Sequence, residues 1–177
     1  MYLCRMFVYG SKRKAVQVSM NVIYTPLTMK DSEEFFHLAG DKRVAATMRF
    51  KCPQTIEESD RILADYVSEG NRTFAFRVRT DQELQGIFAF KEESGSDAAD
   101  LSMMMVPEQW GHGLGNQVVS DMVELAGKEK WYKAMEGYVL ETNTASRLMA
   151  VKNGFREKER HRFPGMTEDL VVYRITF

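Results

Sequence analysis

One segment restricts the fold of this chain more than any other: an apolar run followed by a glycine-rich turn and a helical pattern. Residues 101–106 form an apolar run bounded by turn residues, which predicts a buried strand. Glycines follow at 111, 113 and 115, and apolar residues then recur at helical spacing over about 116–130. Because glycine permits positive φ and close approach to the main chain, this order predicts amide groups at a helix N-terminus that favour an anion such as a diphosphate.

Two other phosphate-binding patterns do not fit this turn. The dinucleotide-binding fingerprint needs glycines spaced G-x-G-x-x-G at the opening of a βαβ unit, whereas the glycines here are each two apart and late in the chain. A Walker A loop needs Gly-Lys-Ser or Gly-Lys-Thr, which the sequence lacks. A tight loop with a purely structural role stays open at this point.

Hydrophobic periodicity predicts strands and helices along most of the chain. A capping box of Thr55 with Glu58, followed by an apolar stripe, indicates a helix that ends by Gly70. Further helices are expected at 31–38, 44–48, 116–130 and 144–152, and strands at 17–24, 73–79, 84–91, 101–106, 135–140, 155–163 and 170–176. This order predicts an α/β (α+β) fold, in which helices cover both faces of a mixed sheet.

Length and composition limit the classes of function. The chain has 177 residues, which predicts a single domain over 1–177, with 1–14 either an extension or an edge strand. A net charge of -1 argues against nucleic-acid binding through phosphate attraction. No membrane span or leader pattern is found, so we expect a cytoplasmic protein. Cys4 and Cys52 are expected to be reduced thiols, with a disulfide left open, and no metal site is predicted because the three histidines form no cluster.

The glycine-rich turn resembles the acyl-CoA pyrophosphate loop of the GNAT superfamily of N-acetyltransferases, written Q/R-x-x-G-x-G/A. Gly113 and Gly115 match its two glycines, whereas Trp110 stands where the family has Gln or Arg. The Trp-Gly-x-Gly-Leu form is similar to the branch that acetylates the N-termini of ribosomal proteins. The resemblance implies a mostly antiparallel sheet of six to seven strands, splayed apart between the fourth and the fifth.

A second match lies downstream of the turn. The segment from Asn143 through Ser146 and Lys152 to Phe155 is similar to the N-x-x-S and K-x-G-F pattern that follows the fifth strand of that family. The two motifs occur in the family's order and at its interval. The resemblance covers roughly residues 17–177 and is firm over 98–155.

The resemblance implies acetyl-CoA as the cosubstrate and indicates which residues surround it. Main-chain groups near the end of the fourth strand would bind the pantetheine arm, and amides of the turn would bind the pyrophosphate. His112 is expected to face solvent or the CoA phosphates, and Asn143 would bond the pantetheine amides while also capping a helix. The residues predicted to bind the cosubstrate are Met105, Val106, Gly111, His112, Gly113, Leu114, Gly115, Asn116, Asn143 and Lys152.

The same resemblance implies direct attack of a neutral amine on the thioester, with no covalent enzyme intermediate. Ser146 matches the family's serine and is the expected acid for the leaving thiolate, because the tyrosine used elsewhere in the superfamily would fall near Ala150. A hydroxyl at a helix start is also a common cap. Asp100, at the start of the fourth strand, and Glu141, at the end of the fifth, are candidate bases, and each is otherwise a solvated strand-end charge. A chain of water molecules is the third option.

The acceptor is expected to be a primary amine of a small molecule or of a protein N-terminus. Two alternatives stay open: a protein-lysine acetyltransferase, which the pattern at 138–143 also resembles, and a CoA-binding sensor without turnover. The family implies an acceptor pocket around residues 29–70 and 156–168. It also implies that the last strands can pair between subunits of a homodimer.

Overall fold

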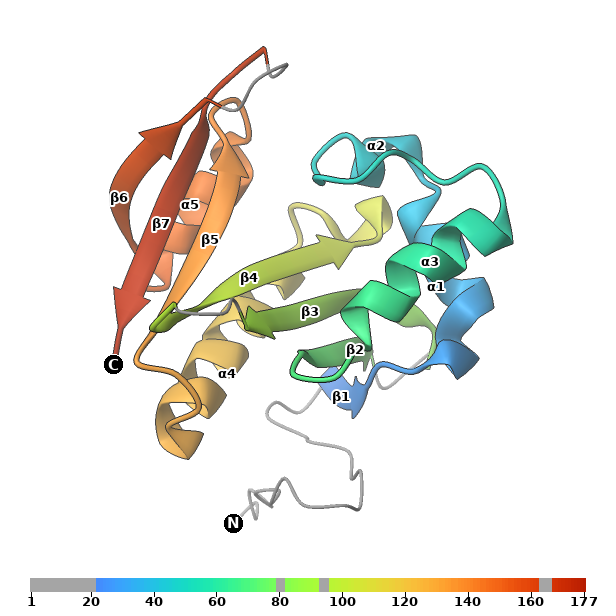
Figure 1. The fold of residues 1–177 in the computed structure, drawn as a ribbon, viewed down its shortest axis with the longest axis horizontal. Helices are drawn as coiled ribbons and strands as arrows, with labels where there is room; N and C mark the ends of the chain where they lie inside the picture. Colours follow the sequence, from blue (N-terminus) through green and yellow to red (C-terminus); the bar gives the residue numbers. More distant parts are fainter. Residues whose placement is uncertain (1–21, 79–81, 93–95, 163–166) are drawn as a thin grey trace. The chain divides into compact units, whose positions relative to one another are not determined.

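The computed structural model describes residues 22–78, 82–92, 96–162 and 167–177. The chain divides into two compact units (Figure 1). Of the described residues, the first unit contains those up to Ala89 together with Met103–Trp110, and the second contains those of Phe90–Ser102 and Gly111–Phe177. The chain passes between the units three times, and the expected single domain stays a prediction. Residues 1–14 and the expected turn at 164–165 lie outside the described residues.

Within the described residues, seven strands form one sheet in the order β1-β2-β3-β4-β5-β7-β6. β1 pairs antiparallel with β2, β5 and β6 both pair antiparallel with β7, and β4 pairs parallel with β5. The mixed, mostly antiparallel sheet was predicted. The strands are β1 (Val22–Pro26), β2 (Arg72–Val78), β3 (Leu84–Glu92), β4 (Ala98–Met105), β5 (Ala134–Leu140), β6 (Arg156–His161) and β7 (Leu170–Thr176).

The ladder between β4 and β5 is short. It joins Ala98–Leu101 to Ala134–Gly137, whereas β5 pairs with β7 along its whole length, as far as Leu140. The predicted splay concerns the residues of the two strands that follow this ladder, and it stays a prediction.

The first strand differs from its expected bounds. Residues 17–21 lie outside the described part, and β1 continues to Pro26, which pairs with Phe74. Proline is tolerated here because β1 is the edge strand of the sheet order and the missing N–H falls at its last residue.

The first unit packs its helices over an apolar core. Figure 1 shows α1 (Ser32–Ala39) and α3 (Ile56–Tyr66) side by side, and the two helices are in contact. Phe35, Leu38 and Leu63 from these helices are at most 2% exposed and join Ile87 and Met104 of the sheet in one cluster. The remaining short elements of this unit are η1 (Met29–Asp31), α2 (Lys42–Ala45) and η2 (Pro107–Gln109).

The capping prediction at α3 is half right. The Thr55 hydroxyl accepts a hydrogen bond from the Glu58 amide at 3.3 Å, as expected. The Glu58 carboxylate, however, accepts from the amide of Gln54 at 2.7 Å rather than from that of Thr55. A full capping box occurs three elements earlier, where Thr28 and Asp31 cap η1.

The second unit contains α4 (Leu114–Glu129) and α5 (Thr144–Lys152). α4 begins two residues before its expected start, and its predicted apolar face is buried at Val118, Val119 and Met122. α5 has the predicted bounds, and Figure 1 shows it against one face of β5 and β7. Among the helices of the described residues, none combines the length and apolarity needed to cross a membrane.

Candidate functional site

The glycine-rich turn adopts the backbone conformation that the sequence predicted. Gly111 and Gly113 have φ of 77° and 89°, in the left-handed region that favours glycine. Gly113 is the N-cap of α4, and no side chain caps this helix. The first bond inside the helix runs from the Gln117 amide to the Gly113 carbonyl at 3.1 Å. The amides of the first turn, at Leu114 to Asn116, are therefore available to an anion.

The outer side of this turn is unobstructed. A Cβ placed on Gly111 or on Gly113 would meet no atom within 4 Å, and both glycines are exposed together with His112. Open space, left-handed glycines and an uncapped helix start fit a diphosphate bound by main-chain donors without a lysine.

The start of α4 is tied to the end of α5 through two asparagines. The Asn153 Nδ2 group donates to the Asn116 Oδ1 atom at 3.1 Å and to the Met149 carbonyl at 2.9 Å. Asn116, predicted to lie in the cosubstrate loop, is thereby held from a segment 37 residues later in the chain.

The second motif forms the start of α5. The Asn143 Oδ1 atom accepts from the Ser146 amide at 3.1 Å, so Asn143 is the N-cap, as expected. Within the described residues, no hydrogen bond engages the Ser146 hydroxyl or the Asn143 Nδ2 group, and both are half-buried. Both groups are therefore free to bond a ligand. Lys152, the last residue of the helix, is exposed.

Glu141, one of the two candidate bases, is bonded by two arginines, one at its carboxylate and one at its main-chain carbonyl. Its carboxylate pairs with Arg160, and its carbonyl accepts from Arg147 Nη1 at 3.1 Å. Arg147 also donates to the buried Tyr173 hydroxyl at 3.2 Å, a bond that raises the pKa of Arg147. These contacts fix the turn between β5 and α5 on the last strand.

Asp100, the other candidate base, is buried rather than solvated. It is 6% exposed, and its partner in the β4–β5 ladder is Glu136, which is 8% exposed. Glu136 Oε1 accepts from Arg174 at 2.6 Å and from Lys158 at 3.0 Å, and the bond to Glu136 is the main reason why the pKa of Arg174 is raised. The alternative of a solvated strand-end charge is therefore wrong for Asp100, which lies beside a carboxylate neutralised by two cations.

Met105 and Val106, at the end of β4, belong to the first unit, and two of their main-chain groups are occupied. The Trp110 indole donates to the Met105 carbonyl at 3.0 Å, and the Val106 amide donates to the Gln85 carbonyl at 2.9 Å. A carbonyl oxygen has a second lone pair, so Met105 can still accept from a ligand. Trp110, which departs from the family pattern, thus ties the start of the turn to the strand before it.

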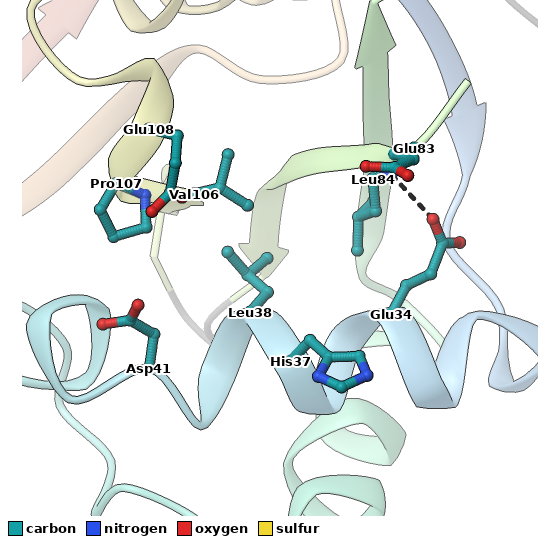
Figure 2. A pocket seen from close by; sticks show the side chains of 9 residues that line it. All are labelled: Glu34, His37, Leu38, Asp41, Glu83, Leu84, Val106, Pro107 and Glu108. Carbon is teal, nitrogen blue, oxygen red and sulfur yellow. Dashed lines mark hydrogen bonds between the residues drawn. The ribbon is translucent and has the colours of Figure 1, made fainter. Parts of the chain in front are cut away.

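The first unit also contains a cavity of about 420 Å³ (Figure 2). Its apolar floor includes Leu38, which Figure 2 shows between Val106 and Leu84. Four carboxylates and His37 surround this floor. Three of the carboxylates pair with arginines, because Arg77 bonds Glu34 at 2.6 Å and Arg43 bridges Asp41 and Glu108. The cavity therefore has an apolar floor and a rim on which three of the four carboxylates are paired with arginines. The charge of the rim alone does not select a cationic ligand. Its lining residues are Glu34, His37, Leu38, Asp41, Glu83, Leu84, Val106, Pro107 and Glu108.

Sequence reasoning missed several polar residues around the site. The sequence pattern did not predict the side-chain contacts of Asn153 and Trp110. Arg147 and Glu136 carried no motif signal. Alternation along β5 could have placed Glu136 on one face with Tyr138, but only the fold brings it to Arg174.

Comparison with known proteins identifies the family. The model of the GNAT acetyltransferase domain matches residues 21–156, which is more than half of the chain. A search of curated proteins finds no match to the chain. The chain belongs to the GNAT acetyltransferase family.

Solved structures of the family share the fold. A GNAT-family acetyltransferase from Bacillus anthracis is 17% identical, with a TM-score of 0.77 over 93% of this chain and 97% of that one. A ribosomal L7/L12 α-N-protein acetyltransferase, RimL, is 14% identical, with a TM-score of 0.79 over 98% of this chain and all of that one. The spermidine N-acetyltransferase from Vibrio cholerae, solved with CoA and spermine, is 14% identical, with a TM-score of 0.75 over 88% and 95% of the two chains.

Membership of this family defines the class of enzyme. The protein is an acyl-CoA-dependent N-acetyltransferase, as its resemblance implied. Among the described residues, no three His, Cys, Asp or Glu side chains are placed to hold a metal ion.

Proposed function

We propose that this enzyme transfers an acetyl group from acetyl-CoA to a primary amine and binds the CoA diphosphate at the turn before α4. The observation that carries the proposal is the uncapped helix start behind two left-handed glycines, within the segment that matches the family model. Neighbours of the same fold were solved with CoA or acetyl-CoA. The residues proposed for cosubstrate binding are those that the sequence indicated: Met105, Val106, Gly111, His112, Gly113, Leu114, Gly115, Asn116, Asn143 and Lys152.

In the proposed reaction, a neutral amine attacks the thioester carbonyl. An N–C bond forms, the C–S bond breaks, one proton leaves the amine, and one proton reaches the CoA sulfur. The protein contributes mainly positioning and electrostatic stabilisation, since no nucleophile of its own is required. The free Nδ2 group of Asn143 can donate to a carbonyl of the pantetheine arm, because its Oδ1 atom is already used by the helix.

Ser146 is the proposed donor of the proton to the thiolate. Its hydroxyl is free among the described residues, and its amide alone serves the helix cap. The hydroxyl is therefore not needed as a cap, which supports a chemical role for it.

Asp100 is the stronger of the two candidate bases for the amine proton. The carboxylate of Glu141 is already paired with Arg160, so one of its oxygens is occupied by an arginine and is not available to the amine. Asp100 is buried next to Glu136, whose carboxylate already bonds Arg174 and Lys158. A chain of water molecules, with no dedicated base, is the competing route.

The proposed acceptor class rests on the neighbours, which include a ribosomal L7/L12 α-N-protein acetyltransferase and a spermidine N-acetyltransferase. Four of the nine residues that line the cavity of the first unit lie in the segment 29–70, where the resemblance implies acceptor contacts: Glu34, His37, Leu38 and Asp41. We place the enzyme in the cytoplasm, where acetyl-CoA is available, and a homodimer through the last strands is consistent with the family.

An acceptor screen tests this function. The protein is incubated with acetyl-CoA and with polyamines, amino compounds, N-terminal peptides or lysine peptides, and the release of free thiol is followed. Turnover on any of the first three supports the proposal. Turnover confined to internal lysines favours the protein-lysine alternative, and tight CoA binding without turnover favours the sensor.

Gly113→Asp tests the diphosphate site. A carboxylate next to a bound diphosphate costs about 4 kcal/mol at 4 Å and an effective dielectric constant of about 20, so we expect the dissociation constant of CoA to rise about 1,000-fold. Gly70→Asp is the matched control, because Gly70 also has φ of 89° and open space around its Cα, but lies in a turn of the first unit. Calorimetry with CoA gives the result, and equal affinities of the two folded variants would refute the site.

Ser146→Ala tests the proton donor. General acid catalysis contributes on the order of 100-fold or more, so kcat should fall about 100-fold, while the dissociation constant of CoA stays unchanged. Helix capping should survive, because it uses the amide of residue 146. An unchanged kcat would remove Ser146 from the chemistry.

A further inference from the structure

Asn153 has no role in the proposed chemistry, yet its side chain reaches the first turn of α4. It is the C-cap of α5, and its Nδ2 group bonds both the Met149 carbonyl at 2.9 Å and the Asn116 Oδ1 atom at 3.1 Å. All of these residues belong to the second unit. The contact therefore joins the end of one helix to the start of another, where the proposed diphosphate site lies.

The hydrogen-bond chemistry fixes the orientation of both amides. The Met149 carbonyl can only accept, so the Asn153 atom that faces it is the NH2 group. The other hydrogen of that same NH2 group points to the side chain of Asn116, whose facing atom must then be its oxygen. The orientation of Asn116 thus follows from a main-chain carbonyl.

This orientation determines what Asn116 can offer to a ligand. With its oxygen bound to Asn153, its NH2 group is left with two donors, and no hydrogen bond engages them within the described residues. The neighbouring amides of the first turn are donors as well. If the side chain were reversed, its oxygen would repel an anion instead.

We infer that Asn153 is a positioning residue for the cosubstrate: it holds the Asn116 amide with its NH2 group available to the CoA diphosphate. The inference rests on the proposed diphosphate site. It predicts that Asn153 affects cosubstrate binding only by orienting Asn116. The effect should therefore occur only with acetyl-group donors that contain the diphosphate.

Asn153→Ala is the test, with two acetyl donors. Acetyl-CoA contains the diphosphate, whereas S-acetylpantetheine lacks it. A hydrogen bond to a charged group contributes about 1.5 kcal/mol, so KM for acetyl-CoA should rise about tenfold. KM for S-acetylpantetheine and kcat with either donor should stay unchanged. Equal increases for both donors, or no increase for acetyl-CoA, would overturn the inference.

A double-mutant cycle separates positioning from a general loss of stability. In the Asn116→Ala background, Asn153→Ala should change the dissociation constant of CoA by less than twofold, because the side chain that it orients is gone. A tenfold effect that persists in this background would contradict the inference. If Asn153→Ala does not fold, Asn153→Ser replaces it in both experiments, since serine is too short to hold Asn116.

Asn71→Ala is the matched structural control. Asn71 also donates its Nδ2 group to a main-chain carbonyl and to a side-chain oxygen, those of Asp65 and Ser68, but in the first unit. It should lower the unfolding temperature as Asn153→Ala does and leave KM for acetyl-CoA unchanged. The Gly113→Asp result keeps the two proposals apart: if that variant binds CoA normally, the diphosphate site fails, and if only the asparagine variants lack an effect, this inference fails alone.

Discussion

Two glycines, one in each unit, are required for opposite reasons. At Gly86 in β3, an added Cβ would lie 2.3 Å from the Met104 carbonyl oxygen and 2.3 Å from the ring of Phe76. At Gly113, before α4, an added Cβ would meet nothing within 4 Å, but φ is +89°. Glycine is required at position 86 because neighbouring atoms leave no room for a Cβ. It is required at position 113 because the backbone has a positive φ.

This difference separates stability from function in the chain. The space at Gly86 is filled by the protein itself, in a part of the sheet where Phe76 and Met104 are at most 2% exposed. The space at Gly113 is left open by the protein, next to main-chain donors without a cap. Crowding at Gly86 indicates packing, whereas the open space at Gly113 indicates room for a ligand because main-chain donors without a cap lie beside it.

The largest expected effect is on stability, from Gly86→Ala. Because one of the clashing atoms is main-chain, β4 itself must move, and overpacking of this kind costs about 3 kcal/mol or more of unfolding free energy. Urea denaturation measures the loss.

Gly113→Ala tests the other half of the comparison, namely that the space around Gly113 is open. Alanine in the left-handed region costs only about 1 kcal/mol, and no neighbour has to move. If Gly113→Ala destabilised the protein as much as Gly86→Ala, the open space at the turn would not exist in solution, and the proposed diphosphate site would lose its basis.

The sequence predicted local features well, because local rules produce them. The bounds of α5 follow from Asn143 as its N-cap and from Asn153-Gly154 at its end, and the left-handed glycines follow from their spacing after a strand. Each of these depends on residues within a few positions of one another.

The features that it missed join remote segments. The bond between Asn153 and Asn116, and that between Glu136 and Arg174, span 37 and 38 residues. No periodicity encodes them, because each depends on how two elements pack. The burial of Asp100 was missed for the same reason, since a charge at the start of a strand is solvated only if nothing in the folded chain covers it.

The smallest expected effect concerns an exposed charge, where neither crowding nor strain applies. The hydrogen bond from Arg43 is the largest cause that lowers the pKa of Asp41 from 3.8 to about 2. A lowered carboxyl pKa stabilises the fold above pH 3.8, and this contribution is lost as the pH falls from 3.8 towards 2. It should be small, because the pair is solvated.

Arg43→Gln should therefore raise the pKa of Asp41 part of the way back to 3.8, since the amides of Arg43 and Val44 still donate to this carboxylate. A carboxyl titration by NMR measures the pKa directly. Lys42→Gln is the control, because it removes an adjacent positive charge that makes no bond to Asp41 in the described residues. If both variants raised the pKa of Asp41 equally, the positive charge around the start of α2 would be the cause of the lowered pKa. The specific hydrogen bond from Arg43 would then contribute little to it.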